Sequence, residues 1–210
     1  MTVPAQLDHL VLGTPDVEAT SAWIEAATGV RPSVGGPHPG RGTHNVLCSF
    51  GPSTYLEIIG PDPDQPEPGA PRPFGVDDLT EPRLVTWCAR PADIDSHVEA
   101  AAGTDVEYSA PEPMSRQAPS GRLDWRLAVV VSGDEGGIVP FVIDWGTSTH
   151  PAATAAVGLH LESLTATHPA PEGLAATFEE LAIDLELRQG DRAGLVAVVA
   201  GPTGRVQLGA

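Results

Sequence analysis

The stretch LDHLVLGTPD, residues 7–16, contains the pattern from which the fold of this chain can be predicted. Its first six residues are mostly apolar and read as a short strand, and the glycine and proline that follow are typical of a turn. Asp16 is a residue type that caps helix N-termini, and apolar side chains then recur at helical spacing until Gly29. We therefore predict a strand, a turn and an amphipathic helix over residues 7–29.

The same order of features returns twice along the chain. An apolar run at residues 84–89 precedes a helix pattern capped by Asp93, and a third run begins at residue 158. After each helix come strand candidates that are separated by glycine-rich turns. These candidates are residues 43–50 and 54–59, residues 123–131 and 138–144, and residues 183–188, 194–200 and 205–208. The pattern indicates a β-α-β-β-β unit that occurs twice and then, in part, a third time.

The chain is strongly acidic. Its 210 residues include 28 acidic and 11 basic residues, for a formal net charge of -17, and every basic residue is an arginine. Proteins bind nucleic acids and anionic membranes through basic side chains, so this charge excludes both kinds of partner. Hydrophobic residues make up 41% of the chain and charged residues 19%, which is the composition of a protein that buries a core.

The sequence also bears on where the protein works and on its cysteines. The chain starts without a basic or long apolar leader, and no stretch approaches the ~18 apolar residues that would span a bilayer. We therefore expect a soluble cytoplasmic protein. Cys48 and Cys88 lie inside apolar strand-like runs without metal-ligand spacing, which favours buried structural thiols.

Two side chains on the predicted strands of the first unit could form a metal site. His9 lies on the first strand and Glu57 on the last, each shortly before a glycine-bounded turn. On a curved sheet both could converge on the concave face, where an imidazole and a carboxylate suit a divalent metal ion. The alternative is that Glu57 simply pairs with an arginine or an exposed amide.

Four stretches of the chain together resemble a known family: residues 7–13, 42–45, 54–59 and 140–145. They are similar to the glyoxalase-like domain branch of the vicinal oxygen chelate superfamily, which includes glyoxalases, bleomycin-resistance proteins and extradiol dioxygenases. In the metal enzymes of that superfamily, each unit gives one histidine from its first strand and one glutamate from its fourth. Their metal holds two adjacent substrate oxygens, or binds oxygen for ring cleavage.

The resemblance implies an α+β fold in which paired βαβββ units form a half-barrel, with a C-terminal βαββ extension packed on it. The glyoxalase-like domain would cover residues 5–150, with units at about 5–60 and 83–146, and the extension would cover residues 157–209. A proline-rich crossing loop would join the two units. Phe74 lies in the middle of this loop, and an aromatic side chain there indicates a docked segment rather than a free linker.

Carried over by the resemblance, His9 and Glu57 match the two metal ligands of the first unit. Glu57 could also act as a catalytic base, because a carboxylate near a metal ion can move a proton. The second unit departs from the pattern. Where its first strand should present a histidine, the chain offers Thr86 or Trp87, depending on a one-residue choice of register.

The rest of the expected metal site is also changed. The second-unit position that corresponds to Glu57 holds Ile143 or Asp144, again depending on register. His44 could supply a replacement metal ligand, because its strand would neighbour that of Glu57. Alternation along that strand turns either His44 or Asn45 inward, and we count His44 among the metal-ligand candidates and Asn45 among the ligand-binding candidates.

Two further histidines are expected to be solvated. His38 and His150 each lie beside proline, and His38 is also flanked by glycines, which is typical of loops. Neither is predicted to contribute to a site.

A second cluster, residues 114–126, could hold an organic ligand. Arginines are scarce in this chain, and here Arg116 and Arg126 could bind a carboxylate, phosphate or diketone beside an aromatic wall formed by Trp125 or Trp87. This arrangement favours an anionic or oxygen-rich small molecule. The alternative is that these arginines neutralise neighbouring acids on strand edges.

Two functions from different classes follow. The first is a glyoxalase-like lyase, isomerase or dioxygenase that uses a divalent metal, of open identity, to chelate adjacent substrate oxygens. The second is a metal-free protein that binds or sequesters a small molecule, with tryptophans as pocket walls. Paired units within one chain allow either a monomer or a homodimer, and the half-barrel could also act only through protein contacts.

Overall fold

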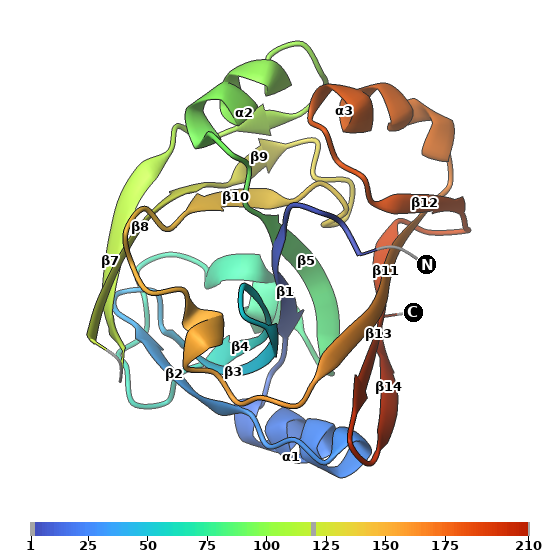
Figure 1. The fold of residues 1–210 in the computed structure, drawn as a ribbon. Helices are drawn as coiled ribbons and strands as arrows, with labels where there is room; N and C mark the ends of the chain where they lie inside the picture. The colour runs from blue at the N-terminus through green and yellow to red at the C-terminus, as the bar shows by residue number, and fades with distance from the viewer. Residues whose placement is uncertain (1–2, 119–120, 210) are drawn as a thin grey trace.

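The fold was analysed on a computed structural model that describes residues 3–118 and 121–209. Strands dominate it, and the largest sheet curves round on itself (Figure 1). This sheet has eight strands in the order β2-β3-β4-β1-β5-β10-β8-β7. The α+β fold class and the half-barrel are confirmed.

The two units of the half-barrel are arranged symmetrically about its middle. Their first strands, β1 and β5, lie next to each other and run antiparallel, and the sheet continues outward through β4, β3 and β2 on one side and through β10, β8 and β7 on the other. The first unit consists of β1 (Leu7–Gly13), α1 (Val17–Thr28), β2 (Ser33–His38), β3 (Thr43–Gly51) and β4 (Thr54–Pro61). The second consists of β5 (Arg83–Ala89), α2 (Ile94–Ala101), β6 (Glu107–Tyr108), β7 (Glu112–Ala118), β8 (Gly121–Ala128), β9 (Val130–Ser132) and β10 (Phe141–Asp144).

Both helices begin where the sequence predicts. The carboxylate of Asp16 accepts a hydrogen bond from the backbone N–H of Ala19 at 2.9 Å, and Asp93 accepts one from Ser96 at 2.7 Å. Each helix packs its apolar side chains against the convex face of the sheet. There Ile24 of α1 and Ile94 of α2 share one core with Leu10 and Trp87.

The sequence misses the two edge strands of the large sheet, β2 and β7. Their sequences, SVGGPH and EPMSRQA, lack the apolar alternation that marks a half-buried strand. Both strands lie at an edge of the sheet, where each is hydrogen-bonded to only one neighbour. The predicted strand over residues 123–131 also divides into β8 and β9, which belong to different sheets. Strand β9 pairs with β6 in a separate two-stranded ribbon.

The third unit forms its own sheet behind the half-barrel. It consists of β11 (His160–His168), α3 (Ala175–Glu180), β12 (Glu186–Gln189), β13 (Gly194–Gly201) and β14 (Gly204–Leu208), so it has three strands after its helix. The sheet order is β12-β11-β13-β14. Leu164 and Leu195 of this sheet join the core that Leu10 and Ile24 form on the convex face. The third unit therefore covers the back of the half-barrel, away from its concave side (Figure 1).

Short 3-10 helices complete the described chain: η1 (Pro73–Asp78), η2 (Pro151–Ala153) and η3 (Pro171–Gly173). Phe74 of η1 packs against the cluster that contains Phe141, with ring centroids 5.6 Å apart, so the proline-rich segment is docked on the half-barrel. Within the described residues, no helix is long and apolar enough to cross a membrane.

The seam between α1 and β13 provides a test of how the third unit is attached. A Cβ atom added at Gly201 would overlap the carbonyl oxygen of Thr28 at the end of α1, whereas one added at Gly194, in the same strand, meets nothing within 4 Å. We expect Gly201→Ala to lower the free energy of unfolding by about 2 kcal/mol, because the third sheet must shift away from α1. Gly194→Ala should change it by less than about 0.5 kcal/mol. Urea unfolding of both variants measures this, and equal stabilities would contradict the close packing.

Candidate functional site

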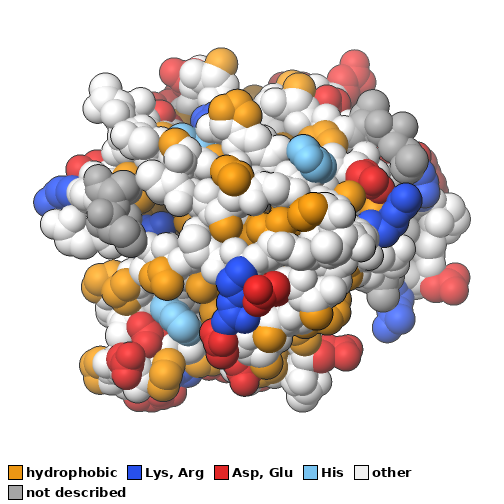
Figure 2. Space-filling view, turned by 60° about the horizontal axis from the view of Figure 1, so that its bottom comes forward, with side chains coloured by type: hydrophobic (Ala, Val, Ile, Leu, Met, Phe, Trp, Pro, Cys, Tyr) orange, Lys and Arg blue, Asp and Glu red, His pale blue; other side chains and the backbone are white. Residues whose placement is uncertain are grey.

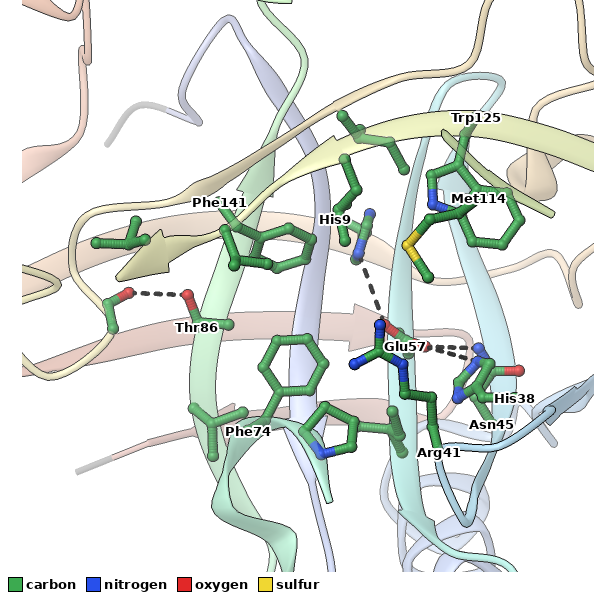
Figure 3. Close-up of a pocket in the computed structure, with 18 of the residues that line it drawn as sticks. His9, His38, Arg41, Asn45, Glu57, Phe74, Thr86, Met114, Trp125 and Phe141 are labelled. Carbon is green, nitrogen blue, oxygen red and sulfur yellow. Dashed lines mark hydrogen bonds and ion pairs between the residues drawn. The ribbon is translucent and has the colours of Figure 1, made fainter. Parts of the chain in front are cut away.

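A large cavity opens on the concave side of the half-barrel. Its volume is about 820 Å³, and both units contribute side chains to its wall. Polar groups gather on the side of the first unit, and aromatic groups of the second unit and of η1 lie across from them (Figure 3). The lining residues used below are His9, His38, Asn45, Tyr55, Glu57, Phe74, Thr86, Met114, Arg116, Trp125, Phe141, Ile143 and Trp145.

The ring of His9 is fixed on three sides. Pairing between β1 and β5 is irregular between Leu7 and His9, which marks a bulge at Asp8. Next to this bulge the Nδ1 atom of His9 lies 2.7 Å from Asp8 Oδ1. The ring stacks on Tyr55 with centroids 4.5 Å apart and meets the edge of Phe141 at 5.4 Å. His9 is thereby held with its Nε2 atom toward the cavity.

Asp8 is a completely buried carboxylate that binds several parts of the chain together. Its Oδ2 accepts a hydrogen bond from Trp145 Nε1 at 3.1 Å and lies 3.0 Å from His150 Nε2 and 3.4 Å from Arg90 Nη1. Burial by itself would raise the pKa of Asp8, but the hydrogen bonds from His150 and His9 outweigh it and hold the pKa well below its usual range. An ionised Asp8 accepts a hydrogen bond from Nδ1–H of His9, which fixes the orientation of the ring.

Glu57 lies between two histidines. Its Oε2 is 3.6 Å from His9 Nε2, and its Oε1 is 3.8 Å from His38 Nε2 (Figure 3). The side-chain amide of Asn45 donates a hydrogen bond to Oε1 at 2.5 Å. His38 is oriented by Thr43, whose Oγ1 lies 2.9 Å from His38 Nδ1. The carboxylate is thus positioned by an amide and faces an imidazole nitrogen on each side.

Electrostatics around Glu57 favour a neutral imidazole at His38. Burial lowers the pKa of His38 despite the opposing charge of Glu57, and the guanidinium of Arg116 adds to this effect. A neutral His38 that donates its Nδ1 proton to Thr43 presents a bare Nε2 to the carboxylate. Because a lone pair that faces a carboxylate is repelled by it, a cation between these atoms would stabilise the arrangement.

The residue types of this cluster suit a divalent metal ion. The two short distances run to different oxygens of Glu57, Oε2 toward His9 at 3.6 Å and Oε1 toward His38 at 3.8 Å. Ligand atoms of these three residues do not all lie within 4.8 Å of one another in the described chain, so the side chains would have to close in around an ion. Two imidazoles and one carboxylate, here His9, His38 and Glu57, are ligands that iron and zinc accept, with positions left open for substrate. All three come from the first unit.

A different grouping, Asp8, His9 and Cys88, does bring three potential ligand atoms within 4.8 Å of one another. It is a poorer metal site. Burial raises the pKa of the Cys88 thiol well above its usual value, so the sulfur stays protonated. The oxygens of Asp8 already accept hydrogen bonds from His9 and Trp145.

The cavity includes several of the residues expected from the sequence. His9 and Glu57 face each other there, and Asn45, Arg116 and Trp125 line the wall. In the second unit Thr86 and Ile143 face the cavity at the positions where metal ligands were expected. The structure therefore settles the open choices of register toward Thr86 and Ile143.

Three expected site residues lie elsewhere in the described chain. Strand β3 turns Asn45 inward, and alternation places His44 on the other face of the sheet, outside the cavity wall. Trp87 is buried in the convex core, where its Nε1 donates to the carbonyl of Ile138 at 2.8 Å. The side chain of Arg126 is 40% exposed and pairs with Asp95 at 2.7 Å.

Two histidines expected in solvated loops belong to the site instead. The His38 side chain is only 19% exposed and ends an edge strand, whose glycines and proline hid it from periodicity analysis. The His150 side chain is 13% exposed because it reaches Asp8, 142 positions earlier in the chain. A contact between residues so far apart leaves no signal in local sequence.

Comparison with known proteins identifies the family. The family model described as "Glyoxalase-like domain" matches residues 7–182. The chain belongs to this family. No match to this glyoxalase-like domain protein is found among curated proteins.

Solved structures share the fold at low sequence identity. A hypothetical protein from Staphylococcus aureus is 18% identical, with a TM-score of 0.61 over 96% of this chain and 84% of that one. A Streptomyces coelicolor methylmalonyl-CoA epimerase in complex with 2-nitronate-propionyl-CoA is 15% identical, with a TM-score of 0.51 over 70% and 99%. A mutant of 4-hydroxymandelate synthase from the same organism is 15% identical, with a TM-score of 0.54 over 99% and 63%. At these identities the likeness concerns the fold alone.

The central role of Asp8 can be tested through stability. Asp8→Asn keeps the shape of the side chain but removes the charge that His9, His150 and Arg90 surround. We expect the free energy of unfolding at neutral pH to fall by about 3 kcal/mol, as for one lost partner of a buried ion pair. The exposed Asp191→Asn is the control and should change it by less than about 0.5 kcal/mol. Urea unfolding with chelator present compares them, and an Asp8→Asn variant as stable as the control would contradict this role.

Proposed function

We propose that this glyoxalase-like domain protein is a small-molecule enzyme of the lyase, isomerase or dioxygenase type. It would hold a divalent metal ion with His9, Glu57 and His38 and bind adjacent oxygens of an anionic or oxygen-rich substrate. The observation that supports this is the meeting of two imidazole Nε2 atoms with one carboxylate, at 3.6 Å and 3.8 Å, on the wall of a cavity. A metal bound there would act as a Lewis acid that polarises substrate oxygens.

The residues of this chain would have separate roles around the substrate. Asp8 orients His9, and Asn45 holds the Glu57 carboxylate through Oε1. The rings of Phe74 and Phe141 would exclude water from the cavity, which strengthens electrostatic interactions within it. A carboxylate near a metal ion can also move a proton, so Glu57 is the catalytic base that we propose.

One observation favours the second candidate function, a metal-free binding protein. The second unit presents Thr86 and Ile143 to the cavity where it would otherwise contribute metal ligands. The second unit also contributes Trp125 and Trp145 to the cavity wall. Their ring centroids lie 5.6 Å apart, and the two rings could hold an aromatic ligand. In that case binding of such a ligand would be insensitive to chelator.

Metal content distinguishes the two functions. We expect protein purified without chelator, and offered iron, zinc, manganese and nickel, to bind about one ion per chain. His9→Ala, Glu57→Gln and His38→Ala should each lower the metal affinity by at least about tenfold, because each removes a ligand. Elemental analysis after dialysis at fixed free metal measures this.

His44→Ala is the matched control for His38→Ala. Both are histidines of neighbouring strands, but His44 lies outside the cavity wall, so its replacement should leave metal content unchanged. Loss of metal in the His44 variant and retention in the His38 variant would refute the proposed ligand set. A wild-type protein that binds none of the four metals would exclude the enzyme proposed here.

A further inference from the structure

Arginines in this acidic protein fall into two groups. Most pair with a carboxylate on the surface, and on the face shown in Figure 2 blue basic side chains lie beside red acidic ones. Arginines with a carboxylate oxygen within 4.0 Å are Arg31, Arg72, Arg90, Arg122, Arg126, Arg188 and Arg205. Among the described residues no such partner is found for Arg41, Arg83, Arg116 or the exposed Arg192, and the first three of these line the cavity.

Arg116 differs from the other two because it is buried. It is only 9% exposed, whereas Arg41 and Arg83 are exposed at the edge of the cavity. From β7 it reaches across to β2, where Nη1 donates a hydrogen bond to the carbonyl of Gly35 at 2.8 Å. A guanidinium has five N–H groups, and this is the one hydrogen bond it makes within the described chain.

A buried charge without a charged partner is costly. The free-energy cost of removing a guanidinium from water is offset only when an anion or a full set of hydrogen-bond acceptors replaces the water. The carbonyl of Gly35 satisfies one donor, and the cavity lies next to the others. The burial of Arg116 is therefore explained if an anionic group of a ligand binds its remaining N–H groups.

The surroundings of Arg116 indicate the rest of the ligand. The cavity wall also carries apolar and aromatic side chains, among them Met114, Trp125 and Phe141 (Figure 3). The ring centroids of Trp125 and Trp145 lie 5.6 Å apart. A volume of about 820 Å³ is in the range of pockets for drug-sized molecules and exceeds the needs of a two- or three-carbon compound. The cavity suits a bulky apolar body that carries one anionic group.

We propose that the cavity takes an aromatic carboxylic acid whose carboxylate is bound by Arg116 and whose rings pack against Trp125 and Trp145. A planar carboxylate matches the guanidinium fork, and one buried positive charge matches a monoanion better than a phosphate dianion. The inference rests on the proposed function in taking the same cavity as the substrate site. It does not depend on a metal ion, because Arg116 is not one of the proposed metal ligands His9, Glu57 and His38.

A pair of probes that differ only in charge tests this inference. 2-Naphthoate carries the carboxylate, and 2-naphthamide has the same rings and a neutral amide. With chelator present, we expect the wild-type protein to bind 2-naphthoate at least about tenfold more tightly than the amide, as a charge-assisted hydrogen bond provides. Isothermal titration calorimetry measures both dissociation constants. Failure to bind either probe, or equal binding of both, would overturn the proposal.

Variants assign the preference to a residue. Arg116→Gln should weaken 2-naphthoate binding at least about tenfold and leave amide binding unchanged, whereas Arg116→Lys, which keeps the charge without the fork, should lose less. Arg122→Gln removes an exposed arginine from the neighbouring strand and should have no effect. A thermal unfolding midpoint within a few degrees of wild type shows that a variant is folded. If Arg116→Gln does not fold, Arg116→Lys provides the test: 2-naphthoate binding as tight as in the wild-type protein would contradict the role of the guanidinium fork.

The outcomes also separate this inference from the proposed function. A preference for 2-naphthoate that appears only when metal is added would show that the metal, not Arg116, holds the carboxylate, and would overturn the inference. The inference would also be overturned if the folded Arg116→Gln variant still preferred 2-naphthoate to 2-naphthamide. Conversely, a chelator-insensitive preference that requires Arg116, in a protein that takes up no metal, would support the anion site and remove the metal enzyme.

Discussion

The buried carboxylate of Asp8 is the interaction on which the candidate site depends. It joins the start of β1 to Trp145 and His150, in the segment that follows the last strand of the second unit, and to Arg90 at the end of β5. An ion in a protein interior is tolerated only when its partners replace water, so these groups must assemble together. Once they do, the orientation of His9 follows. The two units are therefore linked at the same point at which the polar end of the cavity is organised.

The two units of the half-barrel share a backbone arrangement, but they place different kinds of side chain in the cavity. Glu57, His38 and Asn45 meet on the side of the first unit, together with His9. The equivalent side of the second unit is made of Thr86, Ile143 and aromatic rings. Such a division would let one side of the cavity hold an ion or a proton and the other an apolar group of a ligand. The cavity is polar at one wall and apolar at the other as a result.

The third unit repeats the strand–helix–strand order, yet it contributes packing rather than site residues. Its apolar face is buried against α1 and the convex side of β1, in the same core as Leu10 and Ile24. A large curved sheet needs cover on its outer face, because apolar side chains alternate onto both faces of each strand. The layer behind the barrel provides that cover, and the cavity on the concave side remains open for a ligand.

The sequence by itself determined the strands and helices whose signals lie close together along the chain. The strand and capped helix after residue 7 and their repetition after residue 84 follow from hydrophobic periodicity and capping residues that are close in sequence. The half-barrel and the roles of His9 and Glu57 came from the resemblance of four short stretches to a known family. Together these were enough for the α+β half-barrel and for His9 and Glu57 as its principal candidates.

Tertiary structure alone decided what depends on contacts between distant residues. The edge strands β2 and β7 exist because of pairing with their neighbours, and β2 carries His38, whose burial no periodicity reveals. Arg116 on β7 was a candidate from the sequence, but its burial and its hydrogen bond to Gly35 were not predictable from it. The choice between His44 and Asn45 required the face of a strand, and the burial of His150 required Asp8 to lie beside it. A strand pattern specifies alternation but not which face is concave, because that is set by how the whole sheet curves and what packs behind it.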